Sequence, residues 1–190
     1  LSVGQTTFGA AARILLDPRT TLALSHDSFN QTAARDPLRN REIGDRSRRE
    51  SAITLTRQLN EDWSLAFGAA RTEQHVPPAQ RADRPGHDGK RTDIGLRLER
   101  NLGDGANVYV FGQKTLRRQG DIRRNDRLGL GGTYALNPAL AVSAELSGGT
   151  GGLGAAVGVD YAPSDATGAY LTYRLDQDRA YSLTQPYDLT

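Results

Sequence analysis

Apolar and polar residues alternate with a period of two along much of this 190-residue sequence. Four runs show the alternation most clearly: 128–136, 140–147, 153–161 and 169–176. Successive side chains of a β-strand point to opposite faces, whereas an amphipathic helix needs apolar residues spaced near 3.6 positions. The pattern therefore predicts strands that each have one apolar face and one face of small or polar residues.

The first half of the chain follows the same plan less regularly. Further alternating runs occur at 7–14, 53–59, 63–69 and 94–99. The run 108–111 is apolar at every position, so its pattern leaves open which side chains share a face. Together these runs predict about ten strands of roughly 9–13 residues, which is longer than the five or six residues usual in soluble domains.

The connections between the runs are of two kinds. Five are short and contain Asn, Asp, Pro or Gly, the residues that favour tight turns: 17–20, 60–62, 103–106, 137–139 and 162–166. The others are two long polar loops at about 30–49 and 77–90, a shorter one at 119–125 and a glycine-rich link at 148–152. Short and long connections alternate, so we expect the short turns at one end of the strands. The predicted fold is all-β, an antiparallel up-and-down meander over residues 1–190 that forms a transmembrane β-barrel or a portion of one.

In this arrangement the sequence resembles the outer-membrane β-barrel proteins of Gram-negative bacteria over nearly its whole length. The segments 128–146, with its Asn137-Pro138 turn, and 153–175 particularly resemble part of a large, porin-like barrel or an autotransporter-type translocator. The resemblance implies an outer-membrane location and a role as pore, translocator or membrane anchor. The chain starts without methionine and ends at Thr190 without a terminal aromatic residue. We therefore expect a processed or excised chain. Either its ten strands close on themselves, or the remaining strands or a passenger domain belong to a longer protein.

Composition excludes a helical membrane protein and leaves a barrel open. Mean hydropathy is -0.57 and 24% of residues are charged, so no stretch approaches the roughly 20 apolar residues of a spanning helix. In a barrel only every second residue meets lipid, and the others face a polar lumen. The charged residues predicted to face a lumen are Arg13, Arg97, Glu99, Glu145, Asp160, Arg174 and Asp176. We expect ion pairs there between Arg97 or Arg174 and Glu145 or Asp160. The alternative is a soluble, exported all-β binding module whose polar face meets solvent.

Nearly all of the positive charge is arginine, since Lys90 and Lys114 are the only lysines. Arginine binds phosphate through a planar fork, so clusters in outward loops suit the phosphates of lipopolysaccharide. The residues predicted to make this contact are Arg39, Arg41, Arg46, Arg48, Arg49, Arg117, Arg118, Arg123 and Arg124. Interleaved acidic residues and the lack of accompanying aromatic residues disfavour nucleic acid. The expected partners are outer-membrane lipid and lipopolysaccharide.

The sequence shows no convincing catalytic or metal-binding pattern. It has no cysteine, and its histidines, His26, His75 and His87, lack metal-ligand spacing. The pairs His26-Asp27 and His87-Asp88 invite comparison with outer-membrane proteases, which use Asp and His at the barrel rim. Adjacent strand residues point to opposite faces, so neither pair alone makes a base and its orienting group. We expect no enzyme, no metal and no cofactor, with a hydrolase at the rim as the remaining alternative.

Overall fold

The computed structural model describes residues 5–31, 34–36, 41–43, 46–78, 86–164 and 167–175. They form twelve strands: β1 (Gln5–Asp17), β2 (Thr20–Gln31), β3 (Ala34–Asp36), β4 (Arg41–Ile43), β5 (Arg46–Gln58), β6 (Trp63–His75), β7 (Gly89–Gly103), β8 (Ala106–Gly120), β9 (Arg127–Asn137), β10 (Leu140–Gly149), β11 (Gly152–Ser164) and β12 (Thr167–Arg174). The backbone of β3 and β4 is described without their side chains.

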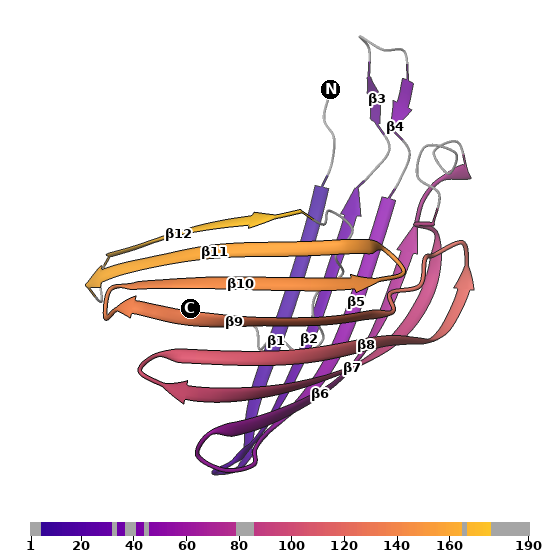
Figure 1. Cartoon of the computed structure of the whole chain (residues 1–190). Helices are drawn as coiled ribbons and strands as arrows, with labels where there is room; N and C mark the ends of the chain where they lie inside the picture. The colour runs from indigo at the N-terminus through magenta and orange to yellow at the C-terminus, as the bar shows by residue number, and fades with distance from the viewer. Residues whose placement is uncertain are drawn as a thin grey trace.

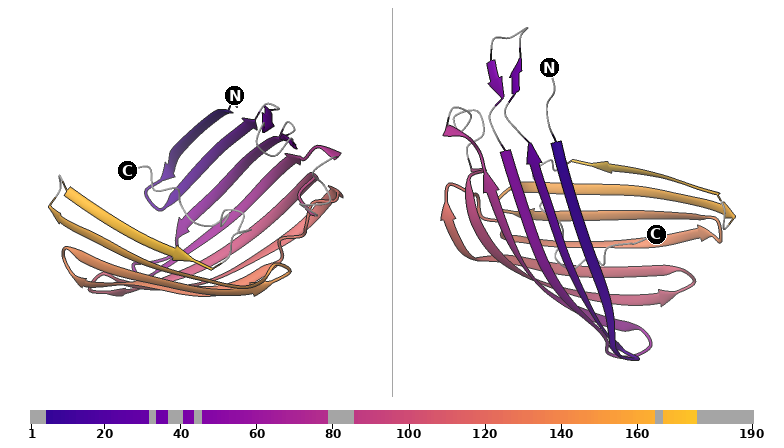
Figure 2. Two further views of the ribbon diagram at one scale, coloured as in Figure 1. Left: turned by 90° about the horizontal axis from the view of Figure 1, so that it is seen from above. Right: turned by 180° about the vertical axis from the view of Figure 1, so that it is seen from behind.

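Ten of these strands form one antiparallel sheet in the order β1-β2-β5-β6-β7-β8-β9-β10-β11-β12. Every strand pairs with its neighbour along the chain, apart from the β3–β4 hairpin inserted between β2 and β5. Within the described residues the sheet curves strongly but does not close, since β1 and β12 have no strand on their outer sides (Figures 1 and 2). The predicted up-and-down meander of a barrel, or of a portion of one, is therefore confirmed.

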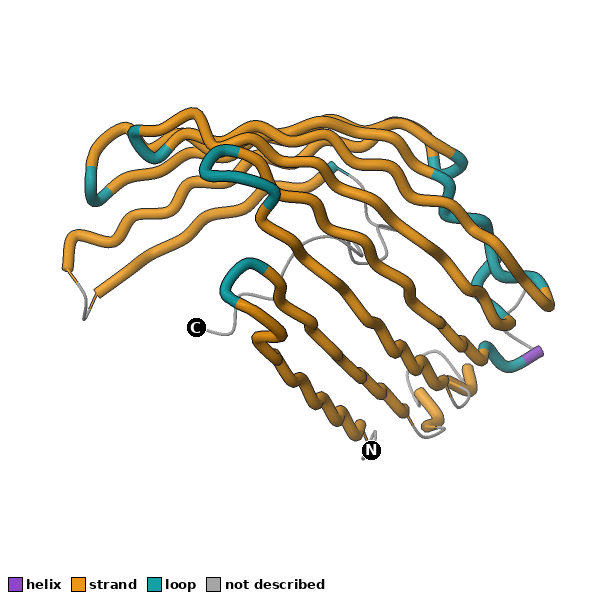
Figure 3. Tube along the Cα trace, turned by 90° about the horizontal axis from the view of Figure 1, so that it is seen from below, coloured by secondary structure: helices purple, strands orange, loops and turns teal. Residues whose placement is uncertain are grey.

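The short turns lie at one end of the strands, and the described parts of the other connections lie at the opposite end (Figure 3). Side-chain oxygens of Asp17, Asn60 and Asn137 accept backbone N–H groups two residues on, which closes three of these turns. In a fourth, Asp104 and Gly105 both have positive φ, 51° and 71°. Two central residues with positive φ are typical of the hairpin turn whose twist matches the flanking strands. Residues 165–166, in the fifth predicted turn, lie outside the described residues.

The long connections contain more strand than the sequence predicted. In the predicted loop 30–49, β2 continues to Gln31, β5 begins at Arg46, and the β3–β4 hairpin lies between them. The strand β8 extends to Gly120, so Arg117 and Arg118 are strand residues. These extensions are polar on both faces, and a hydrophobic pattern cannot detect such strands.

The described residues form a single layer with little apolar core. Only five apolar residues among them are buried, and the two at the end with long connections are Val76 and Ile122. In a β-sandwich the leucines and valines of the alternating runs pack on a second sheet; here they are exposed. No helix among the described residues is long and apolar enough to cross a membrane.

Candidate functional site

One face of the ten-stranded sheet, which we call the belt face, carries nearly all of the large apolar side chains. Its members include Phe8, Leu24, Ile53, Leu55, Phe67, Leu96, Val108, Val110, Leu130, Tyr134, Leu146, Leu153, Val157, Val159, Leu171 and Tyr173. Their exposed fractions run from 36% at Val159 to 85% at Leu153. Two exposed apolar residues on the edge strands, Leu15 and Tyr170, are exceptions, since their strand positions point to the opposite face. So large a continuous apolar surface requires an apolar environment or a partner.

Strand register aligns the belt-face residues in rows across the sheet. Val110, Leu130, Leu146 and Ala155 are successive partners on β8, β9, β10 and β11. The run 108–111, undecided from its pattern, places Val108 and Val110 on this face. A shift of the pairing by one residue would move all apolar side chains of a strand to the opposite face. The continuous apolar rows therefore favour this register over its neighbours.

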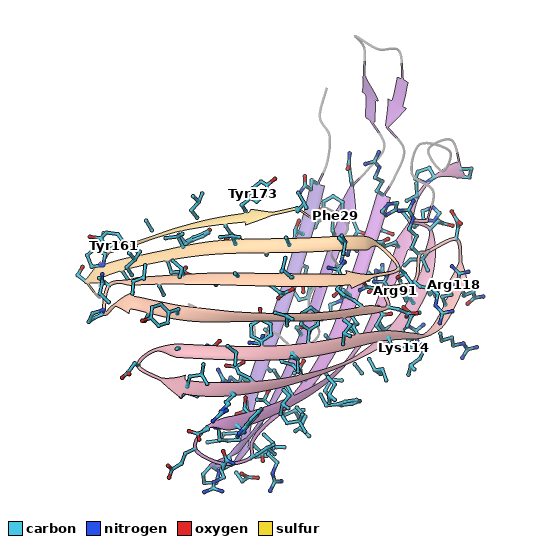
Figure 4. The ribbon with its side chains drawn as sticks, viewed as in Figure 1. Phe29, Arg91, Lys114, Arg118, Tyr161 and Tyr173 are labelled. Atoms are coloured by element: carbon cyan, nitrogen blue, oxygen red, sulfur yellow. The ribbon has the colours of Figure 1, made fainter. Side chains whose placement is uncertain are left out.

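The belt face is bounded by amphipathic residues toward the short turns. The guanidinium of Arg100 lies 5.5 Å from the centroid of the Trp63 ring, near the β5–β6 turn. Tyr134 and Tyr161 occupy the same face close to their own turns (Tyr161 is labelled in Figure 4). Trp and Tyr concentrate at membrane interfaces because their rings are apolar and their N–H or O–H groups form hydrogen bonds with water.

The opposite face, which we call the polar face, carries small, polar and charged side chains, and many of them are buried. The buried set includes Glu50, Thr72, Arg91, Asp93, Gln113, Thr115, Arg127, Glu145 and Ser147. In a single-layer sheet, these side chains are covered only by their neighbours and by the connections. Side chains converge on the inner side of a curved sheet, so this burial identifies the polar face as the inner side of the curve in Figure 2.

A hydrogen bond on the polar face joins two strands that are not neighbours. The hydroxyl of Tyr109, on β8, donates to Oε2 of Glu145, on β10, at 2.8 Å. The ring crosses β9 above Gly131, where an added Cβ would lie 2.6 Å from the Tyr109 ring and 2.7 Å from the carbonyl oxygen of Ala144. Gly129 gives the same room to Phe111. The glycines of β9 are therefore required by the aromatic residues of β8.

Three further groups of polar contacts lie on this face. Arg97 pairs with Glu99 at 2.6 Å, and its guanidinium stacks 3.6 Å from the Tyr109 ring centroid. Arg91 pairs with Asp93 at 2.5 Å, and Asp93 accepts the Thr115 hydroxyl at 2.6 Å. Arg127 donates to Ser147 at 3.1 Å. The predicted partner of Arg97, Glu145, is linked to it through Tyr109.

The residues predicted to face a lumen divide between described and undescribed positions. Arg97, Glu99 and Glu145 lie in the contacts above. Arg13, opposite Ala23, and Asp160, opposite Ala141, are in the polar-face register and exposed. The backbone of Arg174 pairs with Ala156, and its side chain lies outside the described set, as does the whole of Asp176.

The arginines predicted to contact lipopolysaccharide do not form one cluster. Of the members whose side chains the structure describes, only Arg49 and Arg117 are on the belt face, where register places them opposite Glu73 and Thr92 respectively. Arg48 pairs with Glu50 on the polar face at 2.7 Å.

The remaining members of that predicted set lie elsewhere. Arg46 is opposite Gln31 in the polar-face register. Arg118 donates to the carbonyl oxygen of Ile122 at 3.4 Å, Arg124 pairs with Asp126 at 3.2 Å, and the carbonyl oxygen of Arg123 accepts from Arg91 at 2.9 Å. Arg41 is described in backbone only, and Arg39 lies outside the described residues.

The histidines occupy separate positions. His26 lies on the belt face of β2, and its Nδ1 is 2.9 Å from Oγ of Ser51 on β5. His75 Nδ1 is 3.3 Å from Asp88, a residue that also accepts the backbone N–H of Val76 at 3.0 Å. The sequence did not predict either pairing, since the partners are 25 and 13 residues apart. No group of three metal-ligating side chains occurs in the part of the chain that the structure describes.

No protein-family model matches the sequence, and no curated protein matches it at the sequence level. Among solved structures, outer-membrane phospholipase A from Escherichia coli aligns with a TM-score of 0.57 at 15% identity, over 95% of this chain and 72% of that one. The Salmonella typhi phospholipase, a dimer with bound calcium, aligns with a TM-score of 0.55 at 15% identity, over 90% and 69%. The KdgM porin aligns with a TM-score of 0.53 at 12% identity, over 90% of each chain. At these identities the likeness shows the fold, that of bacterial outer-membrane β-barrels.

The comparisons correct one expectation from the sequence. We expected no enzyme, but two of the matched structures are phospholipases, so this fold supports catalysis as well as passage. The exclusion of an enzyme is wrong. It relied on adjacent His-Asp pairs, whereas strand pairing brings distant residues together. The autotransporter-type translocator stays a prediction.

Proposed function

We propose that this chain forms the wall of a β-barrel in the bacterial outer membrane, with the belt face toward lipid and the polar face lining a water-filled passage for small polar solutes. The observation that carries the proposal is the division between the two faces. One exposes nearly every large apolar side chain, and the other contains the least exposed ion pairs, Arg91–Asp93 and Arg97–Glu99.

Energetics favour lipid as the environment of the belt face. Apolar surface gains roughly 25 cal/mol for each Å² removed from water. Residues as exposed as Leu130 (59%) and Leu146 (62%) realise that gain only when something apolar covers them. A membrane tolerates a β-sheet only when the sheet closes into a barrel, because every backbone group must then pair between strands. The proposal therefore requires β1 and β12 to pair with each other or with further strands.

The polar face suits water better than a packed interior. It has arginines and carboxylates in close pairs, which are costly inside an apolar core. Nε of Arg97 and Nδ2 of Asn125 are buried without a hydrogen-bond partner among the described residues. Water entering a passage can satisfy both atoms. The fold shared with the KdgM porin supports the same role.

Reconstitution of the purified chain in vesicles tests this proposal. Trp63, the one tryptophan, lies at the edge of the belt face, so lipids brominated along their acyl chains should quench its fluorescence. The same preparation should give conductance steps in a planar bilayer. A monomer that stays soluble without detergent and shows no quenching would overturn the membrane assignment. Quenching without conductance would overturn the passage and leave a membrane anchor.

A second candidate function rests on the His26–Ser51 pair, at 2.9 Å on the belt face. When the imidazole proton is on Nε2, Nδ1 of His26 accepts a hydrogen bond from the Ser51 hydroxyl. In this arrangement His26 is the base and Ser51 the nucleophile that it activates. The next row toward the middle of the belt face contains Leu24 and Ile53, which contact acyl chains if the belt face meets lipid. The candidate reaction is hydrolysis of a membrane-lipid ester, which is consistent with the fold shared with the phospholipases.

Release of fatty acid from phospholipid by the reconstituted chain tests this candidate. Ser51→Ala should abolish the release, and the matched control Ser28→Ala, on the belt-face register of β2, should retain it. Equal release from both variants, or none from the unmodified chain, would reject Ser51 as a nucleophile.

A further inference from the structure

Five basic side chains gather on the belt face toward the long connections, four of them beyond its apolar rows and Lys114 one row further inward, opposite Ile94. They are Arg49 on β5, Arg71 on β6, Lys90 on β7, and Lys114 and Arg117 on β8. We call this set the basic patch (Lys114 is labelled in Figure 4). The sequence did not predict it, because its members come from four strands.

Register places the basic patch in adjacent rows. One row contains Ser51, Arg71, Thr92 and Arg117 as successive partners. The next row outward contains Arg49, Glu73 and Lys90. Neighbouring strands lie roughly 4.8 Å apart, so four strands spread these charges over about 15 Å.

The basic patch keeps an excess of positive charge. Glu73 is the acidic side chain in these rows, and it is shared by Arg71 at 2.8 Å and Lys90 at 3.3 Å. Those two basic side chains remain 62% and 53% exposed. Arg91 on the polar face differs, since its side chain is 9% exposed and donates to Asp93 and to the carbonyl oxygen of Arg123. The basic patch therefore has charge available for an external anion.

Its distance from the apolar rows matches the depth of lipid headgroups. Ile53 and Ile94 lie two residues inward along their strands from Ser51 and Thr92, about 7 Å at strand rise. The polar headgroup layer extends about 5–7 Å beyond the hydrocarbon core on each side. Phosphates at that depth lie beside Arg71 and Arg117 when acyl chains cover the isoleucines.

The basic patch is confined to one part of the sheet. On β9, β10 and β11 the belt face stays apolar to the strand ends that carry the basic patch on β5–β8. Leu128 and Leu153, at those ends, are 72% and 85% exposed. Lipid bound through phosphate therefore contacts β5–β8 preferentially.

We propose that the basic patch binds the phosphates of an anionic lipid of the outer leaflet, with the lipid A part of lipopolysaccharide as the occupant. Arg71 and Arg117 are the central ligands, because the guanidinium fork holds two phosphate oxygens. Arg49, Lys90 and Lys114 add charge around them. This inference rests on the proposed membrane location of the belt face.

The test uses the full chain reconstituted in phosphatidylcholine nanodiscs and titrated with lipid A, with dephosphorylated lipid A and with inorganic phosphate. We expect binding of lipid A alone. Each basic residue near an anionic membrane contributes about fivefold, so Arg71→Gln combined with Arg117→Gln should weaken binding about 25-fold. The matched control combines Arg19→Gln and Arg57→Gln, which remove the same charge near the short turns and leave Arg100 beside Trp63.

The outcomes separate this inference from the proposed function. Quenching of Trp63 by brominated lipid must persist in both variants, which shows that each is inserted. With quenching intact, equal lipid A affinity in both variants would overturn the basic patch as a binding site. Equal binding of inorganic phosphate would overturn the lipid as its occupant. Loss of quenching in the unmodified chain would overturn the membrane location itself.

Discussion

The two faces of the sheet are built from the same strands but are stabilised differently. On the belt face, large side chains such as Leu130 and Leu146 lie in rows and remain more than half exposed. On the polar face, Asp93 and Glu145 are buried and hydrogen-bonded across strands. The comparison shows that the inner face is organised by the protein's own side chains, whereas the outer face depends on its environment. Substitutions on the two faces should therefore have different effects.

The largest effect is expected from the buried ion pair of the polar face. Asp93→Asn leaves the Arg91 guanidinium, 9% exposed, without its carboxylate. Breaking a buried pair typically costs about 3–5 kcal/mol of unfolding free energy. The matched change on the belt face, Glu73→Gln, removes a carboxylate from a 62%-exposed arginine and should cost less than about 1 kcal/mol. Urea unfolding in lipid vesicles measures both, and equal losses would contradict the comparison.

A charge placed in the middle of the belt face should cost nearly as much. Leu130 lies in the row between Val110 and Leu146, so Leu130→Arg places a guanidinium against hydrocarbon. Arginine near the centre of a membrane barrel costs about 2–4 kcal/mol. Thr172→Arg, at an exposed position of the polar face, should change the unfolding free energy by less than about 1 kcal/mol. The same unfolding assay reports both, and a tolerated Leu130→Arg would argue against lipid on that face.

The glycines of β9 give a smaller contrast. Gly131→Ala places a Cβ 2.6 Å from the Tyr109 ring, so the ring or the strand must move, at about 1–3 kcal/mol. Gly112→Ala points to the belt face and meets only Leu128 at 3.7 Å, an ordinary contact. It should be nearly neutral. Similar losses for the two variants would remove the packing role assigned to Gly131.

The smallest expected effect is the loss of one hydroxyl. Tyr109→Phe leaves the buried Glu145 carboxylate without its 2.8 Å donor, while the ring stays above Gly131. The expected loss is about 1–2 kcal/mol, since an acceptor on a charged group loses its partner. Combining Tyr109→Phe with Glu145→Gln should cost less than the sum of the two single changes. Strict additivity would mean that the two side chains act independently.

The alternation in the sequence was sufficient to predict the strands and both faces between 128 and 161, where every large apolar residue is followed by a small or polar one. It was not sufficient at 108–111, where Val108 and Tyr109 are both apolar. There the choice depends on β9, because only Gly129 and Gly131 leave room for rings. Such information lies in the neighbouring strand and not in the run itself.

The candidate sites were harder to predict because they combine residues from several strands. Arg48 and Arg49 are adjacent in sequence but lie on opposite faces, one paired with Glu50 and one in the basic patch. Conversely, Ser51 and His26 are 25 residues apart and in contact. Counting arginines along the chain therefore named two members of the basic patch, Arg49 and Arg117, and missed Arg71, Lys90 and Lys114. Pairing register is the missing information.

A spin-label scan tests the division between the faces most directly. The chain has no cysteine, so single cysteines can be introduced along 140–147 of β10 without background labelling. In lipid vesicles, access of oxygen should peak at the positions of Leu140, Val142, Ala144 and Leu146. Access of a water-soluble nickel complex should peak at Ala141, Ser143, Glu145 and Ser147. Two profiles that alternate in opposite phase would support the account, and profiles without alternation, or in the same phase, would contradict it.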